Sequence, residues 1–331
     1  MNKNLTGLAI IFLFFLFAPN VGNTFWLELL IATLYLAYQG MAWSIIGGLT
    51  GQISLGHPIF IAIGSYTSTY LLINNGLSPL IGMFLGAIIS TIIALLIGFV
   101  SFRYKLQGIF FAMVTLAFCQ VLRILIENIK PLGGAYGLLI PVMEDSWLAF
   151  QFSSKLPYYY ILLTMVIVML IIIRWITKNK MGSYLISIRE NEQAAEAIGI
   201  NPFKYKMIAF MLSGFFGALG GSFMAQYTLF IDPHMADWSF GITILIAVIA
   251  GGMKHPLGPL VGAIVLQPIS EVIRLYWGEV LPGLHLVIYG IILIVIVMYM
   301  PDGVIKGFKD LMAKRKLAAI NKNGTSAEVS S

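Results

Sequence analysis

The residue types that carry chemistry are few and scattered in this sequence. The four histidines are His57, His234, His255 and His285, and the single cysteine is Cys119. This spacing forms no His/Cys cluster for a metal, no His-Glu-x-x-His run and no serine nucleophile elbow. The Gly-x-x-x-x-Gly-Lys-Ser/Thr loop that cradles nucleotide phosphates is also absent. We therefore expect no catalytic residue, no metal, no cofactor and no ATPase activity in this chain.

The most unusual polar cluster is GGLTGQISLGHPIF, from Gly47 to Phe60. It interrupts an apolar run from Trp26 to Ile73, which as one helix would measure about 72 Å against a hydrocarbon core of about 30 Å. A break is therefore required, and its glycines alone could make a simple turn. The cluster carries no charge, however, and uncharged polar groups beside glycines suit irregular backbone that is buried or lines a water-filled path. We predict a broken or re-entrant segment near 47–60, and a translocation pathway at Gly51, Gln52, Ser54, Gly56, His57 and Thr115.

The composition determines what kind of element holds this cluster. Of the 331 residues, 59% are hydrophobic and 10% are charged, whereas soluble proteins carry about 25% charged residues. The apolar segments are long and continuous, as in spanning helices rather than barrel strands. We predict an all-α polytopic membrane protein.

The sequence contains ten apolar segments that could span a bilayer. They lie at 5–19, 25–47, 53–73, 79–101, 107–126, 158–176, 205–228, 239–252, 257–277 and 282–300. The first and eighth are short, so nine spans is the alternative. We interpret the first as a retained span rather than a signal peptide, because it has no convincing cleavage site.

The charged residues orient this bundle. With the N-terminus in the cytoplasm, most lysines and arginines fall on the inner side, as the positive-inside rule requires. The outer side receives only Arg123, Lys130, Lys155 and Arg274. We predict cytoplasmic termini and one transmembrane domain over 1–301, with an outer loop at 127–157, a cytoplasmic loop at 177–204 and a basic, disordered tail at 302–331.

Two pairs of opposite charge stand at helical spacing near outer helix ends. They are Arg123 with Glu127, and Glu271 with Arg274. We interpret them as helix-end anchors, with vestibule charges as the alternative. No chain of ionisable groups runs through the apolar segments, which weakens the case for a proton-driven transporter.

The cytoplasmic loop carries a short amphipathic helix. From Tyr184 to Ile198 there is no Gly or Pro, and Gly199 is a natural stop. Helices that lie on a membrane favour Lys and Arg, whereas this one carries three acids and one arginine. Docking against a partner protein is therefore favoured over lying on the lipid surface.

Several motifs together resemble one family of permeases. Gln193-Ala194-Ala195, followed three residues later by Gly199, is similar to the coupling loop of ABC importer permeases. RENEQAAEAIGI more closely resembles the branched-chain amino acid ABC permeases that pair with a second, different permease. Five further stretches resemble motifs of these permeases and follow in the same order as in that family. They are GLTGQISLGHPIF, KLQGIFFAMVTLAFCQVLR at 105–123, GGAYG at 133–137, AGGMKHPLGPLVGA at 250–263 and MYMPDGVIKG at 298–307.

The resemblance implies a permease subunit of an ATP-driven importer in a prokaryotic inner membrane. It implies branched-chain amino acids as cargo, an extracytoplasmic binding protein, a second homologous permease in a heterodimer and two ABC ATPase subunits, with no nucleic acid partner. Urea or short amides are the alternative cargo, and a stand-alone secondary transporter or channel is the alternative class. The expected coupling residues are Arg189, Glu190, Glu192, Gln193, Ala194, Ala195, Glu196 and Gly199.

Overall fold

A computed structural model describes residues 24–143, 145–277 and 303–307, with scattered positions between 287 and 298. Three predicted parts lie wholly or mostly outside the described residues. They are the first span at 5–19, most of the last span at 282–300, and the tail from residue 308 onward.

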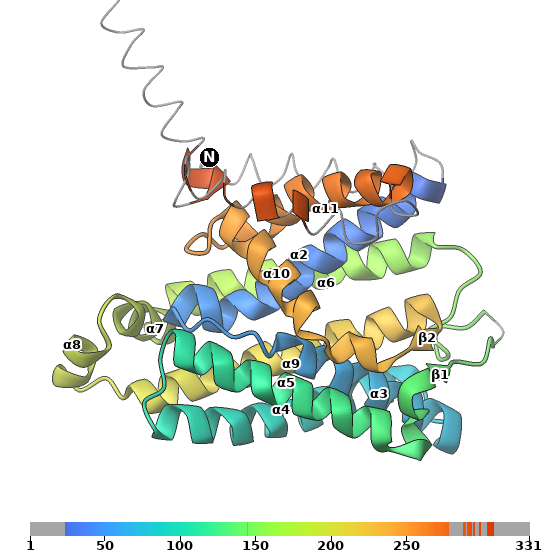
Figure 1. Ribbon diagram of the computed structural model, residues 1–331, viewed down its shortest axis with the longest axis horizontal. Helices are drawn as coiled ribbons and strands as arrows, with labels where there is room; N and C mark the ends of the chain where they lie inside the picture. The colour runs from blue at the N-terminus through green and yellow to red at the C-terminus, as the bar shows by residue number, and fades with distance from the viewer. Residues whose placement is uncertain are drawn as a thin grey trace, which may run out of the picture.

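The described chain is a bundle of helices that run roughly side by side (Figure 1). The helices are α2 (Thr24–Thr50), α3 (His57–Asn75), α4 (Pro79–Arg103), α5 (Ile109–Asn128), α6 (Leu156–Lys178), α7 (Lys180–Glu190), α8 (Glu192–Ala197), α9 (Pro202–Thr228), α10 (Trp238–Gly251) and α11 (Gly258–Trp277). The shorter elements are η2 (Lys130–Leu132), η3 (Gly134–Tyr136), β1 (Leu138–Leu139), β2 (Phe230–Ile231) and η4 (Pro233–Ala236).

Five of the described helices, α2, α4, α5, α6 and α9, are long and apolar enough to cross a membrane. Each predicted segment between 25 and 277 coincides with one long helix or with α3, α10 or α11. Large apolar side chains on α4 face outward, among them Phe84, Leu96 and Phe99, each more than half exposed. Such a surface suits lipid rather than water, so the fold is that of a multi-pass membrane protein.

The two ends of the bundle differ. Helices α7 and α8 project at one end, which we call the α8 end, and the β1–β2 pair lies at the opposite end, the β end (Figure 1). At the β end, Leu138 pairs with Ile231, so the predicted outer loop meets the segment after α9. Gly137 is required there, because its φ is +75° and an added Cβ would lie 2.1 Å from the carbonyl oxygen of Ile231.

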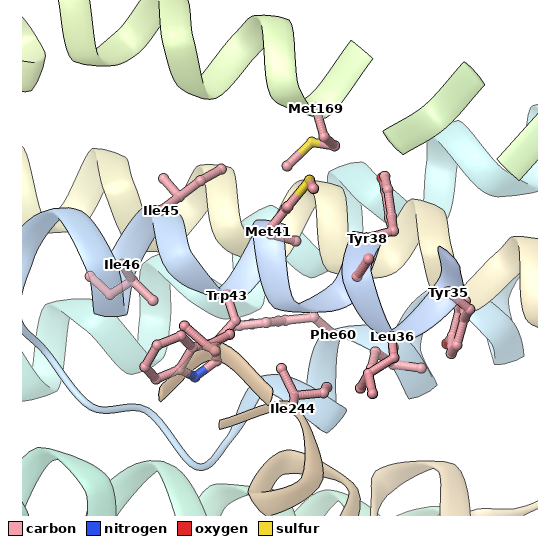
Figure 2. Close-up of a cluster of buried hydrophobic side chains, with 14 of the residues drawn as sticks. Tyr35, Leu36, Tyr38, Met41, Trp43, Ile45, Ile46, Phe60, Met169 and Ile244 are labelled. Carbon is pink, nitrogen blue, oxygen red and sulfur yellow. The ribbon is translucent and has the colours of Figure 1, made fainter. Parts of the chain in front are cut away.

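Helix α2 is the core of the bundle and is buried on nearly all sides. Figure 2 shows Met41 pointing towards Met169 of α6, while Trp43 lies near Phe60 of α3 and Ile244 of α10. A helix enclosed in this way is held in position by its neighbours, and it needs no amphipathic pattern because nearly all of its sides pack against protein.

Helices α3 and α9 pack closely through small residues. An added Cβ at Gly64 would lie 2.0 Å from the carbonyl oxygen of Ala218. Ser222 Oγ donates to Gly64 O at 2.8 Å, and Ser65 Oγ donates to Gly221 O at 2.8 Å. Small residues with interhelical hydrogen bonds are the usual means of joining membrane helices.

The predicted helix from Tyr184 to Ile198 is wrong in its extent. The structure has two helices there, and the chain between them is extended at Asn191, with φ −160° and ψ 108°. Asn191 Oδ1 accepts the backbone N–H of Ala194 at 3.0 Å, so it caps α8 and starts a new helix. The predicted stop is correct, because Gly199 has φ +89° and Ile200 N–H donates back to Ala195 O at 3.0 Å.

Candidate translocation and coupling site

The helix breaks at residues 51–56, between Thr50 and His57. The segment turns back along α2, because Trp43 Nε1 donates to Ser54 O at 2.7 Å and His57 Nε2 lies 3.1 Å from Gln39 Oε1. Gln39 lies three helical turns before the end of α2, so α3 begins about 16 Å from that end. The helix α3 therefore starts deep in the bundle and not at its surface.

The backbone of this break is satisfied by neighbouring polar groups. Leu55 N–H donates to Thr115 Oγ1 of α5 at 3.0 Å, and Gly56 N–H donates to Ser54 Oγ at 3.3 Å. An added Cβ at Gly56 would lie 2.7 Å from the carbonyl oxygen of Thr115. Three of the predicted pathway residues, Ser54, Gly56 and Thr115, thus come together and hold the irregular backbone, as buried backbone requires.

The other three predicted pathway residues lie at different points of the break. Gly51 lies at its start with φ +73°. Gln52 is buried, and among the described residues its Oε1 has no hydrogen-bond partner. His57 is 1% exposed, and its Nδ1 likewise has no partner among them. The break and the start of α3 therefore contain two buried polar atoms that make no hydrogen bond with the described residues.

Gln39 is a residue of this site that the sequence analysis missed. Its side chain is fully buried, and its Nε2 donates to Tyr35 Oη at 3.2 Å and to Gly217 O at 3.4 Å. Together with the His57 contact, this makes a polar chain of three side chains, Tyr35, Gln39 and His57. The signal was available, because a lone glutamine in an apolar span must find partners inside the protein.

Tyr35 also lines a cavity of about 940 Å³ between α2, α3, α9, α10, α11 and η4. Its apolar wall consists of Phe25, Leu29, Ala32, Leu36, Ile61, Met224, Met235 and Phe240. Its polar groups are Glu28, Tyr35, Tyr227, His234, Thr243, Gln267 and Glu271. The described lining therefore holds two carboxylates and no lysine or arginine, and its size and mixed lining suit a small amphipathic molecule.

The end of α7 is attached to the end of α2. Arg189 Nη1 donates to Gly48 O at 2.8 Å, in the last turn of α2, where a cation is favourable. An added Cβ at Gly51 would lie 2.9 Å from Arg189 Cγ. The Arg189 side chain also bonds Glu190 at 2.9 Å, and this hydrogen bond holds the pKa of Glu190 below its usual range. Arg189 therefore touches the chain directly before the break.

Helix α8 is attached to the bundle by its first residue. Glu192 Oε2 accepts from Lys206 Nζ of α9 at 2.7 Å and from Gln107 Nε2 at 2.8 Å. Glu196 instead pairs with Lys105 at 3.5 Å, where both side chains are more than half exposed. Lys206, which the sequence analysis also missed, is 1% exposed, although a lysine inside an apolar span is itself a signal.

The predicted coupling residues thus divide into two groups. Arg189, Glu192 and the buried Ala195 face this chain. The other predicted coupling residues are exposed, as are two neighbours of α8; they are Glu190, Gln193, Ala194, Glu196 and Gly199, with Ala197 and Ile198. We call Gln193, Ala194, Ala197 and Ile198 the α8 tip, and it is small and apolar apart from its glutamine.

A cluster of charges lies nearer the β end. The predicted pair of Arg123 and Glu127 is confirmed at 3.0 Å, and Asp237 before α10 joins it through the guanidinium. Burial raises the pKa of the Asp237 carboxyl, but hydrogen bonds to Ser239 and the Arg123 charge together bring it below its usual range. The Arg274 side chain lies outside the described residues, and the described residues hold no group of three metal ligands.

Comparisons with known proteins agree with this architecture. The family described as "branched-chain amino acid transport system / permease component" matches residues 25–297. The chain is 28% identical over 269 residues to the high-affinity branched-chain amino acid transport system permease protein LivM of Escherichia coli, covering 74% of this chain and 63% of LivM.

Relatives with other cargoes match as well. The guanosine ABC transporter permease protein NupQ of Bacillus subtilis is 28% identical over 232 residues, covering 65% of this chain and 71% of NupQ. The ribose import permease protein RbsC of Haemophilus influenzae is 22% identical over 262 residues, covering 77% of this chain and 72% of RbsC. No solved structure matches the chain. Because the family match covers most of its length, this chain belongs to the family of permease components of branched-chain amino acid transport systems.

Proposed function

We propose that this chain is the permease subunit of an ATP-driven ABC importer for hydrophobic amino acids. It works with a second homologous permease, two ABC ATPase subunits and an extracytoplasmic binding protein. The observation that carries the proposal is the bond from Arg189 to Gly48 O, which attaches the coupling loop to α2 directly before the break.

The exposed α8 tip is the surface on which an ATPase subunit docks. It is small, apolar and uncovered by the described residues, with Ile198 76% exposed. Closure of the ATPase dimer moves α8, and Arg189 passes this movement to the end of α2 and to Gly51. The break then shifts and changes the access to the cavity. Selection of cargo lies largely in the binding protein.

The lining of the cavity suits a hydrophobic amino acid. Its described polar groups include hydroxyls, an amide and two carboxylates, of which Glu28 pairs with Lys155 and Glu271 accepts from Gln267. Polar groups of this kind can hydrogen-bond the ammonium and carboxylate groups of an amino acid. The apolar wall then receives a hydrophobic side chain.

The proposed orientation places the α8 end in the cytoplasm of a prokaryotic cell and the β end outside its inner membrane. Basic residues gather at the α8 end, as the positive-inside rule requires. They are Arg103, Lys105, Arg174, Lys178, Lys180, Arg189, Lys204, Lys206 and Lys254. The described β end holds fewer, Arg123, Lys130 and Lys155.

Co-purification and uptake test the proposal together. The tagged chain, expressed with the genes beside its own, should retain an ATPase, and vesicles containing the complex should take up leucine when ATP is supplied. Uptake of urea, guanosine or ribose in place of leucine would overturn the cargo. A chain that transports without any ATPase would overturn the ABC mechanism in favour of a secondary transporter or channel.

A variant of the α8 tip tests the docking surface. Ala194→Arg adds a long charged side chain there and should abolish co-purification of the ATPase. Val142→Arg is the matched control, because Val142 is 82% exposed and follows β1 by three residues, and it should leave the ATPase bound. Equal retention in both variants would overturn the docking surface.

A further inference from the structure

Lys206 is a charged residue in a place that disfavours charge. It is 1% exposed, lies in the second turn of α9, and has its Nζ 5.4 Å from the centre of the Phe102 ring. A cation near a helix N-terminus opposes the helix dipole, and an ammonium removed from water costs free energy unless it is paired. Its position therefore depends on the partner that pairs with it.

That partner is the first residue of α8. Glu192 Oε2 accepts from Lys206 Nζ at 2.7 Å and from Gln107 Nε2 at 2.8 Å. Gln107 belongs to the connection between α4 and α5, and Phe102 belongs to the last turn of α4. One carboxylate oxygen thus joins α8 to α9 and to the α4–α5 connection at the same time.

Among the described residues, few other contacts attach α8 to the bundle. Within α8, Ala195 is the buried residue, and the other ion pair of this helix, between Glu196 and Lys105, is largely exposed. Exposed pairs contribute little, because water screens them and their side chains lose entropy. The bond between Glu192 and Lys206 is therefore the principal polar attachment of α8.

The two charges cannot separate cheaply. If α8 moved without α9, the ammonium of Lys206 would remain against Phe102 without a partner, and breaking a buried pair costs far more than breaking an exposed one. The lower free-energy response to a displacement of α8 is for α9 and the α4–α5 connection to move with it. A pair with this property transmits movement.

We propose that the buried pair of Lys206 and Glu192 is the joint through which α8 moves the transmembrane helices. Lys206 is a positioning residue in this role, since it acts through Glu192 and touches no cargo. The inference rests on the proposed function and adds to it a residue of α9 that transmits the movement. It differs from a purely stabilising role, because buried ion pairs can often be replaced by apolar residues without loss of stability.

The test uses the full complex, with partner permease, ATPases and binding protein. The double variant Lys206→Met with Glu192→Met removes both charges and leaves neither one buried alone. It should assemble and hydrolyse ATP, while leucine uptake per ATP hydrolysed falls about tenfold, within the usual range of coupling between sites. Lys206→Arg, which retains a cation, should keep coupled uptake.

Lys204→Met is the matched control, because Lys204 is an exposed lysine on the same helix. It should transport as the wild type does. A double variant with wild-type uptake per ATP overturns the joint, and so does one that fails to assemble, since the pair would then serve folding. A wild-type complex that retains no ATPase overturns the proposed function and, with it, the proposed role of the pair. If the wild type is coupled and the double variant is equally coupled, only the proposed role of the pair is overturned.

Discussion

Thr115 provides a sharp test of how the break is held. Its Oγ1 accepts the Leu55 N–H at 3.0 Å and is fully buried. Thr115→Val keeps nearly the same shape and removes this acceptor, so the Leu55 N–H loses its partner. Leaving a buried donor unsatisfied costs about 1–3 kcal/mol. The other bond of the hydroxyl, to Ala112 O, stays within α5 and adds little.

Denaturant titration of the detergent-solubilised protein measures the free energy of unfolding. Thr115→Val should lower it by about 1–3 kcal/mol and should also slow leucine uptake, because the break would sample other conformations. Thr91→Val is the matched control, since Thr91 Oγ1 donates only within α4, to Ala87 O at 2.8 Å. We expect a change of about 0.5 kcal/mol or less for this variant.

Two results would refute the reasoning. If Thr115→Val unfolds like the wild type and transports at the same rate, the hydroxyl does not hold the break. If Thr91→Val is destabilised as much as Thr115→Val, the loss comes from replacing threonine in a helix and not from the orphaned Leu55 N–H.

Three further substitutions test other parts of the structure. Gly64→Ala places a Cβ 2.0 Å from Ala218 O and should give no folded protein on size exclusion, whereas Gly98→Ala, whose nearest neighbours are side-chain atoms, should fold. Since its pKa is lowered, ionised Asp237 stabilises the fold above about pH 4; Asp237→Asn should lower the melting temperature at neutral pH, and the difference should shrink on acidification.

The positions of the helices and of the break could be predicted because they depend on local properties. Apolar length determines where a span lies, and the run from Trp26 to Ile73 was too long for one helix. Its glycines and uncharged polar groups then indicated buried irregular backbone, which the chain has at 51–56. The stop at Gly199 followed from the same kind of local rule.

The split of the predicted helix from Tyr184 to Ile198 depends on a choice that propensity does not decide. Asn191 is tolerated inside a helix and favoured at a helix N-terminus. In the sequence it lies among good helix formers, and a continuous helix was the simpler interpretation. Ala194 N–H donates to the Asn191 side chain, and this hydrogen bond favours the start of a new helix over a continuous one.

The partners within the site could not be predicted, because they are distant in the sequence. Gln39 and His57 are on different helices, and their meeting depends on how far the break returns along α2. Arg189 and Gly48 are in contact although they are 141 residues apart in the sequence. A single sequence identifies such residues as unusual without indicating which of them meet.

These long-range contacts give the predicted coupling loop at 177–204 two attachments with different targets. Arg189 binds the end of α2 at Gly48, and Glu192 binds Lys206 of α9. Asn191 lies between them in extended conformation, so the two attachments belong to separate helices joined at one residue. On the proposed mechanism, a push on α8 reaches α9 through a buried charge pair, which resists separation. It reaches α2 through a single hydrogen bond to the Gly48 carbonyl, which costs less to break than a charge pair that is largely removed from water. The helix α9 would then follow α8 closely while the end of α2 lags behind, and the break beside α2 is where that difference in movement has to be absorbed.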